Sequence, residues 1–333
     1  MPETSVVMSV KNEEAYIVQS VESILGQTYT DFEFIIIDDG SSDNTLSILR
    51  DFSRRDGRIK LISRANKGLV CSLNEGIAQS KGQFIARMDG DDIARHDRLE
   101  KQIVCMKKDP SIHILGSNVD ILWDMGKVMP VSIPEMLNTP LDRHTAKETI
   151  ITHWYCFAHP TWVIRRNVFD TIGCYRECLC DDFDFIIRVV DNDLHVEKLN
   201  EPLLQYRIHP NAKSKRDNRD HEGIKQAIQV KIQSVFKDCV KIPERYAIWG
   251  AGSGGAITYE VLQKTLIGSS CICFIDSFIE GQLNDIPMHK PEKLPFLNCD
   301  YVFIATEPGK KDAMEYLSGE FFLKNIRDYV CTV

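Results

Sequence analysis

Short apolar runs alternate with helix-like stretches through the first 90 residues of this chain. The apolar runs predict strands over residues 5–10, 34–37, 59–62 and 83–88. Apolar side chains at helical spacing predict helices over residues 15–25, 45–52 and 69–78. Regular alternation of strand and helix indicates a parallel α/β sheet with right-handed connections. Ligands of such sheets bind at the carboxyl ends of the strands, so the residues there are the first candidates for function.

Polar clusters stand at the ends of three of these strands. They are Lys11-Asn12, Asp38-Asp39 and Asp89-Gly90-Asp91. Residues two apart on a strand point to the same side, so Asp89 and Asp91 could face one ligand. Carboxylates grouped in this way suit Mg²⁺ or Mn²⁺ bridging phosphates. A solvated acidic turn is the alternative for any one cluster, but three clusters at one sheet edge favour a ligand site.

The pattern becomes mixed between residues 112 and 172 and then changes again. We expect short strands over 112–115, 161–164, 196–199 and 203–208, a helix over 181–190, and a second helix over 222–240. A new α/β pattern starts at Arg245. We therefore predict an α/β domain over residues 1–218, a helical connector over 219–243 and a second α/β domain over 244–333.

The last segment carries a glycine-rich loop between a strand and a helix. The strand ends at Trp249 and is followed by Gly250, Gly252 and Gly255 in the pattern G-x-G-x-x-G, and Asp276 lies 24 residues beyond the second glycine. This spacing fits a Rossmann half, in which phosphate approaches the helix N-terminus and the acid binds ribose. The segment resembles the small Rossmann-like domains that precede sugar acyltransferases or are appended to transferases. It is shorter than two full halves, which argues for a nucleotide-handling, regulatory or dimerisation module.

Composition excludes several classes of protein. A chain of 333 residues suits two domains, and a net charge of −8 argues against a nucleic-acid binder. No apolar run approaches the ~20 residues of a membrane span, and the N-terminus lacks a signal-peptide pattern. Eleven scattered cysteines without a CxxC pair suit reduced thiols rather than zinc ligands. We therefore expect a cytoplasmic protein.

A set of short motifs, in one order along residues 4–215, resembles family 2 glycosyltransferases with a GT-A fold. The motifs are Val10-Lys11-Asn12-Glu13, Ser23-Ile24-Leu25-x-Gln27-Thr28, Ile37-Asp38-Asp39-Gly40-Ser41-Ser42-Asp43, Asn66-Lys67-Gly68, Asn74-x-Gly76, Ala86-Arg87-Met88-Asp89-Gly90-Asp91-Asp92, His159-Pro160, Asp181-Asp182-x-Asp184 and Tyr206-Arg207-x-His209-Pro210. Each motif alone is weak, and the ordered set is specific. The resemblance implies a mixed GT-A sheet flanked by helices, a nucleotide-sugar donor and a divalent metal.

The resemblance assigns the donor side of the site. The residues expected to bind the nucleotide sugar, with a UDP-sugar as the expected donor, are Val10, Asn12, Asp39, Lys67, Asp89 and Gly90. Asp39 would accept hydrogen bonds from the base, while Asp38 would serve the turn. Asp91 and His209 are the expected ligands of Mn²⁺ or Mg²⁺, which offsets diphosphate charge as a Lewis acid. Asp92 is either a neighbour of the metal ligands or a helix N-cap.

The acceptor side is expected around the acids at 181–184. Asp182 matches the second acid of the family's Glu-Asp pair, and inverting transfer needs a base there to take the acceptor's proton. Asp181 stands where the family has Glu, and with His159 it is expected to line the acceptor cleft. Acids at a helix start also favour the helix dipole, and that effect can coexist with catalysis. Asp184 is expected to pair with Arg188 four residues later.

These features predict an inverting glycosyltransferase of polysaccharide or glycan biosynthesis. Its acceptor would be a saccharide or a lipid-linked sugar, and a lipid-linked acceptor would allow peripheral association with the inner face of the membrane. A homodimer is a further option. One alternative is a non-catalytic nucleotide-sugar sensor. A second is a nucleotidyltransferase, although that class normally has a Gly-rich basic loop where this chain has Lys11-Asn12-Glu13-Glu14. A third, an NAD-dependent oxidoreductase, rests on the C-terminal glycines alone.

Overall fold

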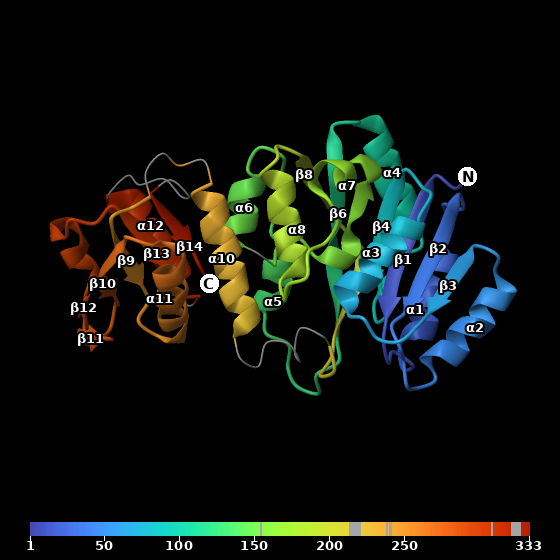
Figure 1. The fold of residues 1–333 in the computed structure, drawn as a ribbon, viewed down its shortest axis with the longest axis horizontal. Coiled ribbons are helices and arrows are strands. Elements are labelled where there is room, and N and C mark those ends of the chain that lie inside the picture. Colours follow the sequence, from blue (N-terminus) through green and yellow to red (C-terminus); the bar gives the residue numbers. More distant parts are fainter. Residues whose placement is uncertain (154, 213–220, 238, 240–241, 308, 321–327) are drawn as a thin grey trace. The chain divides into compact units, whose positions relative to one another are not determined.

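The structure, a computed structural model, describes residues 1–333 except 154, 213–220, 238, 240–241, 308 and 321–327. The chain divides into two compact units (Figure 1). The first contains residues 1–177 and 181–215, and the second contains residues 178–180 and 216–333. The helix over 222–235 falls in the second unit.

The first unit is built on an eight-stranded mixed sheet with the order β3-β2-β1-β4-β7-β6-β8-β5. Its strands are β1 (Thr4–Val10), β2 (Phe32–Asp38), β3 (Ile59–Ser63), β4 (Phe84–Asp89), β5 (Ile93–Ala94), β6 (Ile112–Trp123), β7 (Val163–Arg165) and β8 (His195–Ile208). The four strands expected in the first 90 residues are mutually parallel in the order β3-β2-β1-β4. The sheet becomes mixed at β7, which pairs antiparallel with both β4 and β6.

Helices cover both faces of this sheet. They are α1 (Ile17–Leu25), α2 (Thr45–Arg55), α3 (Leu69–Gln79), α4 (Arg98–Lys108), α5 (Ser132–Leu137), α6 (Ala146–Thr152), the 3-10 helix η1 (His159–Thr161), α7 (Arg166–Ile172) and α8 (Asp181–Val190). The strands β1 and β2 are buried along nearly their whole length because both faces are covered, as their continuous apolar sequence predicts. The carboxyl ends of β1, β2 and β4 therefore meet at one edge of a rigid layer.

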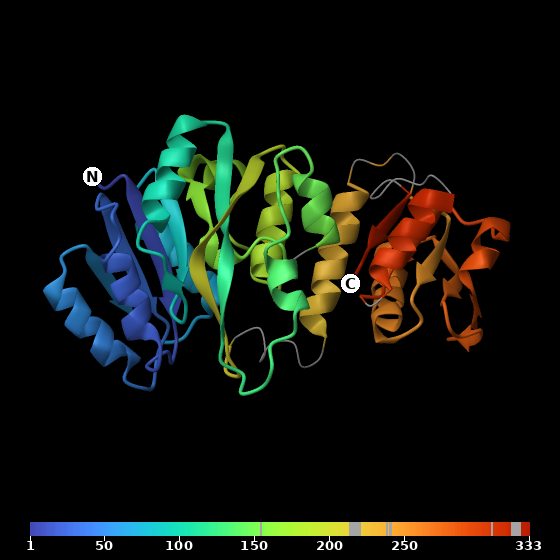
Figure 2. The ribbon, with the colours of Figure 1, turned by 180° about the vertical axis from the view of Figure 1, so that it is seen from behind.

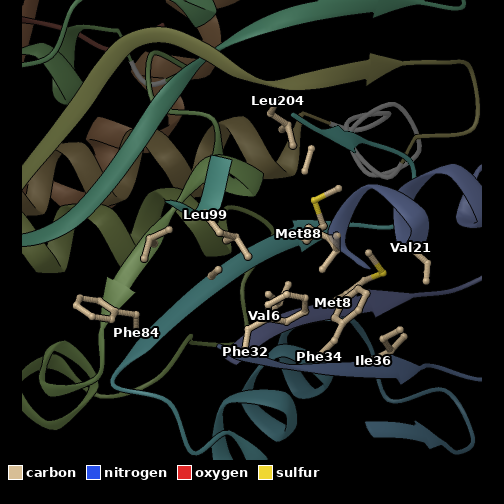
Figure 3. Packing of buried hydrophobic residues seen from close by; sticks show 14 of the residues in the cluster. Val6, Met8, Val21, Phe32, Phe34, Ile36, Phe84, Met88, Leu99 and Leu204 are labelled. Carbon is tan, nitrogen blue, oxygen red and sulfur yellow. The ribbon is translucent and has the colours of Figure 1, made fainter. Parts of the chain in front are cut away.

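Alternate residues of each central strand face opposite sides. Val6 and Met8 of β1 pack with Phe34 of β2 in one large core, to which α1 and α4 contribute Val21 and Leu99 (Figure 3). Figure 2 shows the ribbon of these strands and helices from behind. The helix α3 packs against β1 and β2 (Figure 1). It does so on the opposite face, because Leu73 of α3 lies with Val7 of β1, whose side chain points away from that core. Helices therefore pack on both faces of β1 and β2, and this packing fixes the positions of the strand ends.

Two strands are longer than the sequence pattern predicts. The strand expected over 112–115 continues to Trp123, and the two strands expected over 196–199 and 203–208 form one strand, β8. Polar residues at 200 and 201 interrupt the apolar pattern of β8, but the chain absorbs them as an irregularity opposite Ser117 and Asn118 rather than ending the strand. These long paired strands bring the carboxyl end of β8 to β5, next to the end of β4.

The second unit has a six-stranded sheet in the order β11-β12-β10-β9-β13-β14. Its elements are α10 (Glu222–Val235), β9 (Arg245–Trp249), α11 (Ser253–Thr265), β10 (Ser270–Ile275), β11 (Gly281–Leu283), β12 (Ile286–His289), the 3-10 helix η2 (Pro291–Phe296), β13 (Tyr301–Ile304), α12 (Lys310–Glu320) and β14 (Tyr329–Cys331). All its strand pairs are parallel except β11 with β12. The helix expected to reach residue 240 ends at Val235. Across both units, no helix in the described part of the chain is long and apolar enough to cross a membrane.

Candidate active site

The loops after β1 and β2 are joined by hydrogen bonds. Asn12 adopts a left-handed conformation with φ 57° directly after β1. Its side-chain oxygen accepts a hydrogen bond from the backbone N–H of Ser42 at 2.8 Å, and its own N–H donates to the Ser41 hydroxyl at 3.0 Å. Asn tolerates this conformation better than most residues, which explains its place at the turn. Asn12 thus fixes two strand ends relative to each other.

The two acids after β2 are both buried and both engaged. Asp38 accepts hydrogen bonds from the Ser63 hydroxyl (2.9 Å) and the Ser41 N–H (3.3 Å). Asp39 accepts hydrogen bonds from the backbone N–H groups of Lys67 (2.8 Å) and Gly68 (3.0 Å), and it pairs with Arg64. The Lys67 side chain itself is exposed. An ionised carboxylate has about four acceptor positions, so Asp39 retains capacity for one further donor.

The acids after β4 form a compact cluster with groups from β8 and from the loop after β1. Carboxylate oxygens of Asp89, Asp91 and Asp92 lie within 4.8 Å of one another, and so do ligand atoms of Glu13, Asp91 and His209. Asp91 belongs to both sets. Oxygen and imidazole donors in this number suit Mn²⁺ or Mg²⁺, so the residues fit the divalent metal that the sequence implies.

His209 binds directly to Asp91. Its Nε2 lies 3.0 Å from Asp91 Oδ2, its ring packs edge-on against Tyr16, and only 2% of the residue is exposed. The side chain of Arg207 donates to the Asp91 carbonyl oxygen at 2.7 Å. His209 Nδ1 is buried and has no hydrogen-bond partner among the described residues. The end of β8 therefore closes over the acid cluster.

Asp92 is the buried member of the cluster. Its Oδ1 accepts a hydrogen bond from the Arg207 N–H at 2.7 Å, and its Oδ2 has no partner in the described chain. Burial raises the pKa of Asp92 well above its usual range, and the charges of Asp91 and Asp89 raise it further. The helix α4 begins with Asp97 as its N-cap, so Asp92 is not the helix cap considered above. Asp92 is thus the buried neighbour of Asp89 and Asp91 in the acid cluster.

Gly90 is required by the close approach of two strand ends. A Cβ at this position would lie 2.6 Å from Cγ1 of Val10, the buried last residue of β1, and 3.4 Å from Cγ of Glu13. The valine side chain has little rotamer freedom to move away. Gly90 and Val10 thus bring the ends of β1 and β4 together, which places Glu13 near the acid cluster.

We expect Gly90→Ala to destabilise the protein by about 1–3 kcal/mol, the usual range for overpacking, and to weaken metal-dependent nucleotide binding. Urea unfolding and calorimetry would measure the two effects. The stability loss should shrink when Val10→Ala is already present, because the colliding methyl group is then gone. Equal losses in both backgrounds would show that this contact is not the reason for the glycine.

The acids expected on the acceptor side begin α8. Asp181 is buried and Asp182 is exposed at the start of the helix. Asp184 binds Arg188 at 2.8 Å, so the predicted ion pair is confirmed. Nearby, Nε2 of the buried His159 lies 2.8 Å from the Tyr175 hydroxyl.

A buried tyrosine, Tyr175, and a partly buried one, Tyr206, lie within electrostatic reach of these acids. Burial raises the pKa of Tyr175, and the charges of Asp181 and Asp182 act in the same direction. Burial also raises the pKa of Tyr206, followed by the charges of Asp92, Asp89, Asp91 and Asp182. One hydroxyl on β8 therefore lies within electrostatic reach of both the acid cluster after β4 and Asp182 of α8.

Sequence reasoning did not select three residues of this neighbourhood. Glu13 joins Asp91 and His209, Tyr206 lies among the acids, and Arg87 pairs with Asp89 at 2.6 Å. A usable signal existed for Arg87, because it is a charged residue within a strand that is otherwise apolar, two positions before an acid. Glu13 and Tyr206 stand in the family motifs, but no local pattern assigned them a role, since their roles depend on which strand ends meet.

The glycine loop of the second unit has Rossmann geometry. Gly250 has φ 113°, and a Cβ at Gly255 would lie 1.9 Å from the Gly250 carbonyl oxygen, whereas Gly252 faces open space. Asp276 accepts hydrogen bonds from the N–H groups of Ala251 (3.3 Å), Phe278 (2.9 Å) and Ile279 (3.1 Å). The assignment of nucleotide binding to this loop stays a prediction.

Comparison with known proteins identifies the family. The family model for glycosyl transferase family 2 matches residues 5–173. The putative glycosyltransferase EpsE of Bacillus subtilis is 31% identical over 225 residues, which cover 65% of this chain and 76% of EpsE. The O-antigen biosynthesis glycosyltransferase WbnJ of Escherichia coli is 31% identical over 215 residues, covering 63% of this chain and 82% of WbnJ. This chain belongs to glycosyl transferase family 2 and is a glycosyltransferase.

Solved structures share the fold at low identity. The TarS structure from S. aureus with UDP-GlcNAc aligns with a TM-score of 0.56 and 18% identity, over 79% of this chain and 71% of that one. The mannosyltransferase PcManGT from Pyrobaculum calidifontis, in complex with GDP-Man and Mn²⁺, aligns with a TM-score of 0.52 and 16% identity, over 71% of this chain and 64% of that one. The predicted GT-A architecture is confirmed.

Proposed function

We propose that the enzyme transfers a sugar from a UDP-sugar to a hydroxyl acceptor with inversion, using a divalent metal and Asp182 as the general base. The observation that supports this most is the grouping of Asp89, Asp91, Asp92, Glu13 and His209 from three separate segments. Such a group of acids is costly unless a cation offsets their mutual repulsion. A diphosphate-bound Mn²⁺ or Mg²⁺ would do so.

Asp91 and His209 are the residues that would hold the metal, with Asp89 and Glu13 beside them. The metal, when bound, supplies positive charge against the leaving diphosphate. Val10 and Gly90 would line the donor site, because the close approach of Gly90 to the Val10 side chain brings the ends of β1 and β4 together. Asn12, Asp39 and Lys67 belong to the loops at the neighbouring strand ends, where a nucleoside would lie.

We assign the acceptor side to Asp182, which is exposed at the start of α8. In the proposed reaction, its carboxylate takes the proton from the acceptor hydroxyl as the new C–O bond forms at the anomeric carbon. The bond from that carbon to the diphosphate breaks, and the nucleoside diphosphate leaves with the electron pair. Attack opposite the leaving group inverts the configuration. Asp181 and His159 would shape the acceptor side through Tyr175.

A UDP-sugar is the proposed donor, and a saccharide or lipid-linked sugar the proposed acceptor. The TarS neighbour was solved with UDP-GlcNAc and the mannosyltransferase with GDP-Man, so the fold accommodates either base. The name of WbnJ, an O-antigen enzyme, supports a role in polysaccharide biosynthesis. Cytoplasmic placement, with peripheral attachment to the membrane, remains part of this proposal.

Thermal-shift screening tests the donor class. We expect UDP-sugars with Mn²⁺ to raise the melting temperature more than GDP- or dTDP-sugars do, and we expect each shift to disappear with EDTA, because linkage stabilises only the state that binds. NAD(H) serves as the control for an oxidoreductase. Stabilisation by NAD(H) alone would contradict the proposal. Donor binding with neither hydrolysis nor transfer to any acceptor would instead favour a nucleotide-sugar sensor.

A further inference from the structure

Arg87 is a buried cation in the middle of the central sheet. It lies on β4 between β1 and β7, and its backbone N–H donates to the Trp162 carbonyl oxygen at 2.8 Å. Only 4% of the residue is exposed. Its side chain points away from the core that contains Ala86 and Met88, to the same face as Asp89.

The surroundings of Arg87 are mainly apolar. The guanidinium lines a small cavity of about 10 Å³ together with Val7, Leu73, Ile77, Ile85, Ile164, Phe169 and Tyr175. Its Nη2 binds Asp89 Oδ1 at 2.6 Å. Its Nε and Nη1 are buried and have no hydrogen-bond partner within the described chain. Asp89 is thus the acid to which this arginine is bound.

Stability alone does not explain an arginine here. A buried ion pair usually stabilises a fold no more than well-packed apolar side chains of similar volume, and each unpaired N–H adds a penalty. A methionine or leucine would suit the apolar walls better. What the guanidinium adds is a fixed position for Asp89, at the point where β4 enters the acid cluster.

Arg87 also shares its cavity with Tyr175, the partner of His159. Burial lowers its pKa, but the charge of Asp89, and after it those of Tyr175 and Asp181, more than offset this effect, so the pKa of Arg87 is raised. Asp181 is the first acid of α8, and Tyr175 binds His159. Arg87 is therefore within electrostatic reach of both Asp89, at the end of β4, and Asp181, the first residue of α8.

We infer that Arg87 is a positioning residue for transfer: through its ion pair with one oxygen of Asp89, it orients that carboxylate toward the metal and nucleotide. This inference rests on the proposed function and deepens it. Asp89 also offers a carboxylate oxygen to the acid cluster, within 4.8 Å of ligand atoms of Asp91 and Asp92. Because Arg87 acts through Asp89, its contribution to binding should vanish when Asp89 is neutralised.

A double-mutant cycle on Mn²⁺·UDP binding tests this coupling. Calorimetry would give the dissociation constants of Arg87→Met, Asp89→Asn and the double variant. We expect Arg87→Met to weaken binding by about tenfold, the size expected when one partner of a charged hydrogen bond is lost. In the Asp89→Asn background the same substitution should change the dissociation constant less than about twofold. Independent, additive losses would overturn the inference.

Two further variants separate positioning from folding. Ile85→Ala truncates a neighbour in the same cavity and should lower the melting temperature while Mn²⁺·UDP affinity stays at the level of the unmodified chain. Arg87→Lys keeps a buried cation, should recover part of the affinity, and can replace Arg87→Met in the cycle if that variant does not fold. If the unmodified chain fails to bind Mn²⁺·UDP, the proposed function falls and the inference with it. If the chain binds and the losses are additive, only the inference falls.

Discussion

The Asp182→Asn variant is expected to bind Mn²⁺·UDP as tightly as the unmodified enzyme and to lose transfer, with kcat lowered by about 10²–10⁴-fold. Asparagine keeps the size of the side chain but cannot accept the acceptor's proton. Asp182 is exposed at the start of α8, so the substitution should leave folding nearly unchanged. Steady-state kinetics of UDP release, with calorimetry for binding, would measure both quantities.

Asp184→Asn is the matched control for this experiment. It removes an acid from the same helical turn, but that acid binds Arg188 at 2.8 Å and is buried. We expect a lower melting temperature and a nearly unchanged kcat. Transfer at the level of the unmodified enzyme in Asp182→Asn would eliminate Asp182 as the base. A loss of transfer in both variants would indicate a general effect of charge at the start of α8.

The fold could be predicted where local patterns decide it. Residues 34–37 of β2 are all apolar because helices cover both faces of the sheet, and this leaves a direct trace in the sequence. The long pairing of β6 with β8 left no such trace, since Asn118 and the polar residues of β8 look like strand ends. Their continuity depends on the partner strand, which satisfies the backbone across the irregularity.

The residues of the candidate site likewise fall into those that a local pattern reveals and those that depend on the assembled sheet. Asp89 and Asp91 could be selected because two acids follow each other closely at the end of an apolar strand, which in the structure ends at Asp89. Glu13 could not, because its approach to Asp91 depends on the contact between Gly90 and Val10. The pairing of His209 with Asp91 joins residues 118 positions apart, and only the resemblance to the family placed both at a metal. Contacts that depend on the whole sheet are not encoded in any local pattern.

The second large effect is expected at Asp91. Asp91→Ala should weaken Mn²⁺·UDP binding by at least about tenfold, or ~1.4 kcal/mol, because both groups of metal-ligating atoms lose a common member. His209 would also lose the carboxylate at 3.0 Å from its Nε2. Calorimetric titration of UDP with and without Mn²⁺ measures the effect. Affinity for UDP measured in EDTA should be the same in both proteins, since the loss acts through the metal.

Asp120→Ala provides the control for Asp91→Ala. Asp120 is an exposed acid on β6 and belongs to neither group of metal-ligating atoms. Its removal changes the net charge by the same amount, so a general electrostatic effect on nucleotide binding would appear in both variants. We expect Asp120→Ala to bind Mn²⁺·UDP like the unmodified enzyme. Unchanged affinity in Asp91→Ala would mean that Asp91 does not hold the metal, and the assignment would then move to the other acids of the cluster, Asp89 and Glu13.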